Sequence, residues 1–283
     1  MEGGLRIKGI KKELNYPINE LVSIITVVFN GEKYLKETFN SIIKQSYKKI
    51  EYIVIDGGST DNTIEIIKEY QDHIDYWISE KDLGIYDAMN KGIFLSNGSI
   101  IGMLNADDFL YKETVEKVAM AFRKDNYLDY TYGKVDYVDQ KNQILATSIP
   151  FEKDTLYSRR FLEMPYQHLS LFVKKSIFNE IGFYDPKFKL SADYDFTLKL
   201  LKNKNKSIYL NFSFGGFRSG GRSGSLGSWL DSRKVLLSHN VNINLANLLF
   251  LRSLFLTILY QLTPKKLILF LKKFKKSKWQ ENI

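Results

Sequence analysis

Short apolar runs rich in β-branched residues alternate with amphipathic segments along the first hundred residues. Four runs have the length and composition of buried strands: 21–29, 51–55, 74–79 and 99–104. Between them, apolar residues recur at helical spacing in three segments: 32–44, 62–70 and 85–95. This alternation predicts an α/β fold with a mainly parallel sheet and right-handed crossovers.

The pattern changes after residue 110. Helical spacing continues in three segments: 112–123, 174–181 and 191–201. Strand-like segments are 128–138, 143–149, 169–173 and 207–211, and the first two predict a hairpin. Six glycines between 213 and 228 then favour a mobile lid or phosphate clamp over a plain linker.

Polar side chains follow three of the predicted parallel strands where each strand ends. These are Asn30, Asp56 and the trio Asn105, Asp107 and Asp108. Ligands of open α/β sheets bind at the carboxyl edge of the strands, so the three clusters are expected to share one crevice. Their oxygen atoms suit Mg²⁺ or Mn²⁺ holding a diphosphate. The alternative is that the acids only cap the helices that follow.

Composition and charge narrow the choice of partner. The 283 residues include no cysteine, which excludes disulfides and thiolate chemistry and fits a cytoplasmic protein. The net charge is +9, and seven lysines lie in 265–278 among apolar residues. Together with the apolar segment 248–262, they predict helices that lie on an anionic membrane surface. A core helix with a solvated basic tail is the alternative.

Five segments together resemble a bacterial family 2 glycosyltransferase with the GT-A fold. They are Ser23–Asn30, Val54–Asp61, Leu83–Gly92, Asn105–Asp108 and Ser191–Asp195, so the resemblance spans about residues 20–225. It implies a GT-A type, Rossmann-like mixed sheet flanked by helices. The expected organisation is a lead-in over 1–20, a glycosyltransferase domain over 21–228 and a helical, basic, membrane-associating region over 229–283. Within the domain, 21–110 would bind the nucleotide sugar and 111–228 the acceptor.

The resemblance also implies roles for individual residues. Asp107 would bind the metal, and Asp193 would be the general base of an inverting transfer. Asp56 would accept a hydrogen bond from the uracil ring, and Asn105 would contact the ribose. The nucleotide-sugar site as a whole would comprise Val28, Asn30, Asp56, Gly58, Asp87, Asn90, Asn105, Ala106, His168 and Arg222. Arg222 or Arg218 would grip the diphosphate bidentately.

This chain departs from the family pattern at two motifs. Asn105 stands where the first acid of the D-x-D motif is usual, and Ala192 stands where the E-D motif has its Glu. An amide can hydrogen-bond a hydroxyl but brings no charge to a metal. A helix cap is the alternative role for Asp193.

The expected function is metal-dependent transfer of a sugar from a nucleotide-sugar donor, UDP-linked by resemblance. The acceptor would be a glycan or a polyprenyl-diphosphate-linked glycan of surface-polysaccharide synthesis, at the inner face of the cell membrane. A sugar nucleotidyltransferase and a non-enzymatic membrane-surface module are the alternatives. A nicotinamide-dependent oxidoreductase is disfavoured because Asn30-Gly31-Glu32 follows the first strand, without G-x-G-x-x-G. No nucleic-acid-binding motif is present.

Overall fold

The computed structural model describes residues 1–10, 21–151, 153–218 and 225–262. The chain divides into two compact units, residues 1–221 and 222–283. The division falls inside the glycine-rich segment 213–228. Each unit is described by itself.

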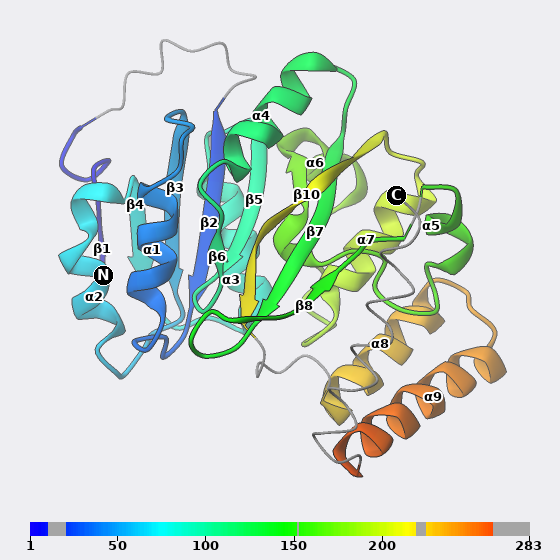
Figure 1. Ribbon diagram of the computed structural model, residues 1–283. Helices are drawn as coiled ribbons and strands as arrows, with labels where there is room; N and C mark the ends of the chain where they lie inside the picture. Colours follow the sequence, from blue (N-terminus) through cyan, green and yellow to red (C-terminus); the bar gives the residue numbers. More distant parts are fainter. Residues whose placement is uncertain (11–20, 152, 219–224, 263–283) are drawn as a thin grey trace. The chain divides into compact units, whose positions relative to one another are not determined.

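The first unit is built on a mixed sheet of ten strands among the described residues (Figure 1). Their order is β1-β4-β3-β2-β5-β9-β7-β10-β6, with β8 beside β7. The strands are β1 (Glu2–Gly3), β2 (Val22–Val28), β3 (Ile50–Asp56), β4 (Tyr76–Ser79), β5 (Ile100–Asn105), β6 (Phe109–Leu110), β7 (Tyr130–Val138), β8 (Ile144–Ser148), β9 (Phe172–Lys174) and β10 (Ser207–Arg218). β2, β3, β4 and β5 are parallel, whereas β9 is antiparallel to both β5 and β7. The predicted mixed α/β fold is confirmed.

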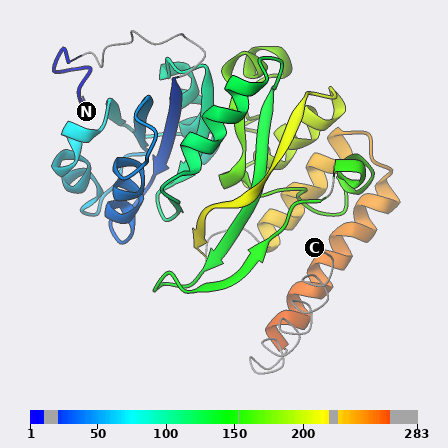
Figure 2. The ribbon, with the colours of Figure 1, turned by 45° about the horizontal axis from the view of Figure 1, so that its top comes forward.

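Helices cover both faces of this sheet (Figures 1 and 2). They are α1 (Leu35–Ile43), α2 (Thr63–Glu69), η2 (Gln71–His73), α3 (Ile85–Leu95), α4 (Thr114–Lys124), α5 (Lys153–Arg159), η3 (His168–Ser170), α6 (Lys175–Ile181) and α7 (Ala192–Lys202). Leu35 and Phe39 of α1 and Val118 of α4 share one core cluster with Ile24 of β2. Ile25, the next residue of β2, faces Gly92 of α3. All seven residues of β2 are therefore buried, which explains why five of them are Val or Ile.

The last strand differs from its prediction. The expected strand ended at Asn211, but β10 continues to Arg218 with two irregularities in its pairing to β7. Its glycines are required by packing, because a Cβ on Gly215 would lie 2.0 Å from the carbonyl oxygen of Phe109 in β6. The prediction of a loop over 213–228 is thus wrong for 213–218, and it is also wrong for 226–228, where a helix begins at Leu226. Residues 219–224 lie outside the described residues.

The N-terminal lead-in was expected to be loose or to lie along the surface, whereas Glu2 and Gly3 pair antiparallel with β4. A Cβ on Gly3 would lie 2.7 Å from the Trp77 ring, so only glycine lets the two strands approach this closely. Residues 11–20 of the lead-in lie outside the described residues.

The second unit contains α8 (Leu226–Ser238) and α9 (Ile243–Leu262). The Ser225 hydroxyl caps α8 by accepting a hydrogen bond of 3.2 Å from the Ser228 N–H. Arg233 donates from Nε to Asn247 Oδ1 at 2.7 Å and so links the two helices. No described helix is long and apolar enough to cross a membrane. The predicted basic segment 265–278 lies outside the described residues.

Candidate functional site

Strand register brings the predicted polar clusters to one edge of the sheet. Val28 of β2 pairs with Asp56 of β3, and Val27 pairs with Asn105 of β5. The carboxyl ends of these three parallel strands therefore lie side by side. This is the edge at which open α/β sheets bind ligands.

Asn30 organises the loops after β2 and β3. It has a positive φ of 52°, a conformation that asparagine tolerates better than most residues. Its Oδ1 accepts a hydrogen bond of 2.8 Å from the Thr60 N–H, and its own N–H donates to Ser59 Oγ at 2.8 Å. Gly58 supplies a second positive φ, 83°, in the same pair of loops. The two loops are thus locked to each other, and Asn30 itself is exposed to solvent.

The Asp56 carboxylate is buried and is engaged by its own loop. Oδ2 accepts hydrogen bonds from the N–H groups of Gly58 and Ser59, each at 3.0 Å, and from Ser79 Oγ at 2.7 Å. Oδ1 accepts from Ser59 Oγ. The side chain has no solvent-exposed area, so contact with a base would require the 57–60 loop to open. Its predicted role toward uracil stays a prediction.

The turn after β5 places two adjacent carboxylates in a poorly solvated position. Asp108 is buried, and burial together with the neighbouring Asp107 raises the pKa of Asp108 to about 8. Burial also raises the pKa of Asp107, which is only half-buried. The backbone carbonyls of Ala106 and Asp108 accept from Thr38 Oγ1 at 2.9 and 2.7 Å. The turn is therefore held rigidly against α1.

These residues fit a hard divalent cation. Asn105 Oδ1 is buried without a hydrogen-bond partner among the described residues, although Asn105 Nδ2 donates to Asp108 Oδ2 at 3.3 Å. The Asn105 amide oxygen and the two neighbouring carboxylates, whose pKa values are raised, form a set of oxygen ligands that suits Mg²⁺ or Mn²⁺. No group of three or more His, Cys, Asp or Glu side chains able to hold a metal occurs in the described part of the chain. Further ligands would therefore come from a bound diphosphate or from water.

The polar residues predicted on α3 are used to shape its surroundings. Asp87 Oδ2 accepts from the Leu83 N–H at 3.0 Å, which closes the turn before the helix. Asn90 donates from Nδ2 to the Tyr184 carbonyl at 2.8 Å and accepts from the Tyr184 N–H at 3.1 Å. The Asn90 amide thus ties α3 to the turn after α6. Contacts of these two side chains with a nucleotide sugar stay predictions.

Asp193 lies in a corner formed by α3, η3 and α7. Its Oδ1 accepts from Tyr86 Oη at 2.8 Å and from the Tyr194 N–H at 2.9 Å. Nearby, His168 Nε2 and Tyr184 Oη form a hydrogen bond of 2.7 Å. Burial lowers the pKa of His168, and the charge of Asp193 acts in the opposite direction. The predicted base and the predicted histidine are therefore neighbours.

Arg218 is buried and its guanidinium is committed to protein partners. Nε donates to the Asp107 carbonyl at 2.9 Å, and Nη1 donates to Asn142 Oδ1 at 2.7 Å. Nη2 forms an ion pair of 2.7 Å with Glu37. These bonds leave Arg218 poorly placed to grip a diphosphate, and they make it an anchor of the acidic turn. Arg222 lies outside the described residues.

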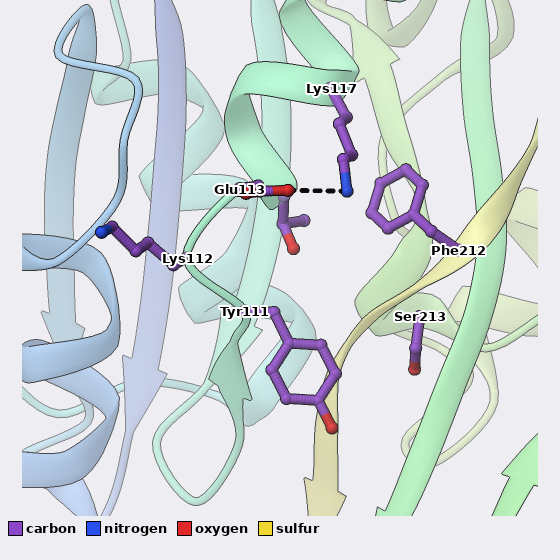
Figure 3. Close-up of a pocket in the computed structure, with 7 residues that line it drawn as sticks. Tyr111, Lys112, Glu113, Lys117, Phe212 and Ser213 are labelled. Carbon is purple, nitrogen blue, oxygen red and sulfur yellow. Dashed lines mark ion pairs between the residues drawn. The ribbon is translucent and has the colours of Figure 1, made fainter.

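A separate cavity of about 300 Å³ opens beside the start of α4 (Figure 3). Lys117 forms an ion pair of 2.9 Å with Glu113 there, and its Nζ lies 4.8 Å from the centre of the Phe212 ring. The cavity is lined by Tyr111, Lys112, Glu113, Thr114, Lys117, Phe212 and Ser213. None of the residues predicted for the site is among them.

The contacts that hold the site residues in place could not be predicted from the sequence. Tyr86 and Asp193 are 107 residues apart, and no local pattern announces their contact. Glu37 and Asn142, which fix Arg218, were equally unassigned. The one available signal for this contact was Tyr86 itself, which lies in the segment Leu83–Gly92 that carries the family resemblance.

Comparisons with known proteins identify the family of the chain. The model of glycosyl transferase family 2 matches residues 23–184. An uncharacterized glycosyltransferase of Rickettsia typhi is 34% identical over 191 residues, which cover 64% of this chain and 59% of that protein. A PGL/p-HBAD biosynthesis glycosyltransferase of Mycobacterium bovis is 29% identical over 187 residues, covering 65% of this chain and 70% of the relative. This chain thus spans less than two thirds of the Rickettsia protein.

Solved structures agree on the fold. TarS of S. aureus, residues 1–349 in complex with UDP-GlcNAc, superposes with a TM-score of 0.59 at 20% identity. The match covers 83% of this chain and 71% of that one. Full TarS gives a TM-score of 0.62 at 21% identity, covering 83% of this chain and 43% of TarS. The family match extends over more than half of the 283 residues, and the chain therefore belongs to glycosyl transferase family 2.

Proposed function

We propose that this glycosyltransferase moves a sugar from a UDP-linked donor to an acceptor hydroxyl in a single, inverting, divalent-metal-dependent step. The observation that carries the proposal is the register of β2, β3 and β5. It brings the Asn30 and Gly58 loops and the acidic turn of Asp107 to one edge of the sheet. The UDP-GlcNAc complex of TarS, a structure of the same fold, agrees with a nucleotide-sugar donor.

The leaving group would be held at the acidic turn. Asp107 and the orphaned Asn105 Oδ1 would hold Mg²⁺ or Mn²⁺, with the diphosphate oxygens completing its ligands. The cation, when bound, supplies positive charge that stabilises the departing nucleoside diphosphate. Thr38 and Arg218 fix the backbone of the turn, so its donor atoms need no rearrangement when the diphosphate arrives.

Asp193 would act as the general base. Both hydrogen bonds that described residues donate to its carboxylate reach Oδ1, so Oδ2 can accept a proton. The acceptor hydroxyl would give its proton to Asp193 as its oxygen forms the new bond to the anomeric carbon. The bond from that carbon to the diphosphate oxygen breaks on the opposite face, and the electron pair leaves with the nucleoside diphosphate. One displacement inverts the configuration without a covalent enzyme intermediate.

The acceptor would be a glycan or a polyprenyl-diphosphate-linked glycan at the inner face of the cell membrane. The name of the mycobacterial relative, a PGL/p-HBAD biosynthesis glycosyltransferase, favours assembly of a surface glycoconjugate. In α9, Leu248, Leu251 and Phe255 are each more than half exposed and follow helical spacing. Seven lysines follow in 265–278. Apolar side chains beside lysines favour contact with an anionic membrane surface.

A donor screen tests the proposal. The native chain is heated with Mn²⁺ and a panel of UDP-, GDP- and dTDP-sugars, because a ligand that binds only the folded state raises the melting temperature. We expect a UDP-sugar to give the largest shift, and the Asp107→Asn variant to lose it. Asp193→Asn should keep the shift and lose transfer by roughly a hundredfold or more. No shift with any nucleotide sugar would refute the donor site, and an active Asp193→Asn would refute the base.

A further inference from the structure

We infer that Tyr86 is a positioning residue that holds the Asp193 carboxylate with one oxygen directed to the acceptor hydroxyl. The inference rests on the proposed function, because it deepens the role of Asp193 as the base. Tyr86 belongs to α3, the helix whose Asp87 and Asn90 are predicted to face the donor. It therefore connects the donor side of the site to the base.

Tyr86 contacts Asp193 from a distant part of the chain. Its hydroxyl donates a hydrogen bond of 2.8 Å to Asp193 Oδ1, across 107 residues of sequence. Asp193 is the second residue of α7. The Tyr86 hydroxyl thus joins α3 to the start of α7 at the carboxylate that would act as the base.

The two bonds to the Asp193 carboxylate both reach Oδ1. The second comes from the Tyr194 N–H at 2.9 Å. No hydrogen bond from a described residue reaches Oδ2. A carboxylate anchored through one oxygen cannot rotate freely about its Cβ–Cγ bond, so Oδ2 keeps one direction. A base held in one orientation is ready to accept the proton without losing further conformational entropy.

Tyr86 is itself held rigidly. Its side chain is buried, and its ring centre lies 5.8 Å from that of Tyr184. The ring centre of Tyr184 lies 5.0 Å from that of Phe196 of α7, and the Tyr184 hydroxyl forms a hydrogen bond with His168. The titratable groups that face Asp193 from neighbouring elements are therefore Tyr86, Tyr184 and His168. Replacing Tyr86 by phenylalanine would keep the ring packing and remove only the hydroxyl.

The split between kcat and KM distinguishes positioning of the base from a structural role. The substrate is the UDP-sugar that gives the largest thermal shift, and its hydrolysis by water is followed as release of nucleoside diphosphate, so no acceptor is needed. For Tyr86→Phe we expect kcat to fall roughly tenfold, because the Asp193 carboxylate loses one of the two bonds that fix the direction of Oδ2. KM for the donor should stay within about twofold.

Tyr111→Phe is a matched control. The Tyr111 hydroxyl donates to Asp136 Oδ2, also at 2.8 Å, in another part of the same unit. This variant loses one tyrosine–aspartate bond of the same length, and its kcat and KM should match those of the native chain. Melting temperatures of both variants, measured with and without the donor, show whether each chain remains folded.

The outcomes separate the inference from the proposed function. An unchanged kcat in Tyr86→Phe, or an equal loss in Tyr111→Phe, would overturn the inference while an inactive Asp193→Asn still supports the base. Activity in Asp193→Asn would overturn the base and the inference together. The same holds if no nucleotide sugar binds the native chain. A loss of kcat at unchanged KM, absent from Tyr111→Phe, supports the positioning role.

Discussion

The backbone N–H of Arg218 donates a hydrogen bond of 2.9 Å to Asp108 Oδ1, across 110 residues of sequence. This contact joins the end of β10 to the acidic turn after β5. The buried Asp108 thus has a donor for one oxygen, and the Arg218 guanidinium holds the neighbouring Asp107 carbonyl. The acidic turn therefore depends on a residue that the sequence places in a glycine-rich segment far away.

Arg218→Met should destabilise the protein by about 2–4 kcal/mol, because it leaves the Asp107 carbonyl and Glu37 without their buried partner. Donor binding at the acidic turn should weaken in parallel. Urea unfolding at pH 7 measures the first effect, and the thermal shift with a nucleotide sugar measures the second. Lys36→Met is the matched control, since it breaks an exposed 2.7 Å pair with Glu69 worth less than about 1 kcal/mol. Equal losses would contradict an anchoring role for Arg218.

Asn105→Asp would restore the acid usual in the D-x-D motif and should tighten Mn²⁺ binding by roughly tenfold, because each added carboxylate strengthens a hard-cation site. Without metal, a third acid beside Asp107 and Asp108 should lower the melting temperature. Calorimetric titration with Mn²⁺ and melting with and without EDTA measure both effects. Asp107→Asn is the opposing change and should abolish binding. If Asn105→Asp lowers the melting temperature and leaves the Mn²⁺ affinity unchanged, the turn is not the metal site.

The central strands could be predicted because both of their faces are buried. β2 has helices on each side, so every residue is apolar or satisfied, and the run stands out in the sequence. The two-residue strands β1 and β6 carry no periodicity and could not be found this way. The glycines at 215 and 216 misled the prediction, since a glycine required by close packing against Phe109 is indistinguishable in sequence from one in a mobile loop.

How much of the site could be predicted from the sequence differs from residue to residue. The ends of β2, β3 and β5 are local features, and parallel pairing alone brings them together. The location of Asp193 came from a family resemblance. Its contact with Tyr86 depends on how α3 and α7 pack, which no local pattern encodes. Likewise, Asp56 was expected to accept a hydrogen bond from uracil, and no local pattern shows that the Gly58 and Ser59 N–H groups also donate to its carboxylate.

Glu51→Gln should destabilise the protein by about 2 kcal/mol at pH 7. Burial tends to raise the pKa of Glu51, but hydrogen bonds from Ser23 and Asn97 and the charge of Arg6 outweigh it, so its pKa is lowered from 4.5. A carboxyl group whose pKa is lower in the folded state than in the unfolded state stabilises the protein at any pH above its unfolded-state pKa. This stabilisation is lost as the pH falls through the folded-state pKa.

The difference in unfolding free energy between the native chain and Glu51→Gln should therefore be constant above about pH 5 and shrink below pH 4.5. Urea unfolding at intervals between pH 3 and 7 measures it. Glu69→Gln, at an exposed pair with Lys36, should show less than about 1 kcal/mol at every pH. A difference for Glu51→Gln that grows as the pH falls would contradict the sign of the shift.

Deletion of residues 263–283 should impair binding to anionic vesicles by a hundredfold or more, because it removes seven lysines, each worth about 1 kcal/mol near such a surface. Donor binding should be unchanged, since all the predicted donor residues, including Arg222, precede residue 263. Co-sedimentation with vesicles containing phosphatidylserine, compared with neutral vesicles, measures the first effect. Unchanged sedimentation would defeat the membrane proposal.

A second variant separates the apolar face of α9 from the lysines. Leu251 and Phe255 are 57% and 64% exposed, so Leu251→Ser with Phe255→Ser should leave folding intact. Electrostatic attraction is screened by salt, whereas burial of apolar side chains in the interface is not. In the native chain, vesicle binding should fall with added salt to a residual level. The double variant should show no binding to vesicles at high salt. If salt alone abolishes binding to vesicles in both proteins, the apolar face of α9 does not enter the membrane interface.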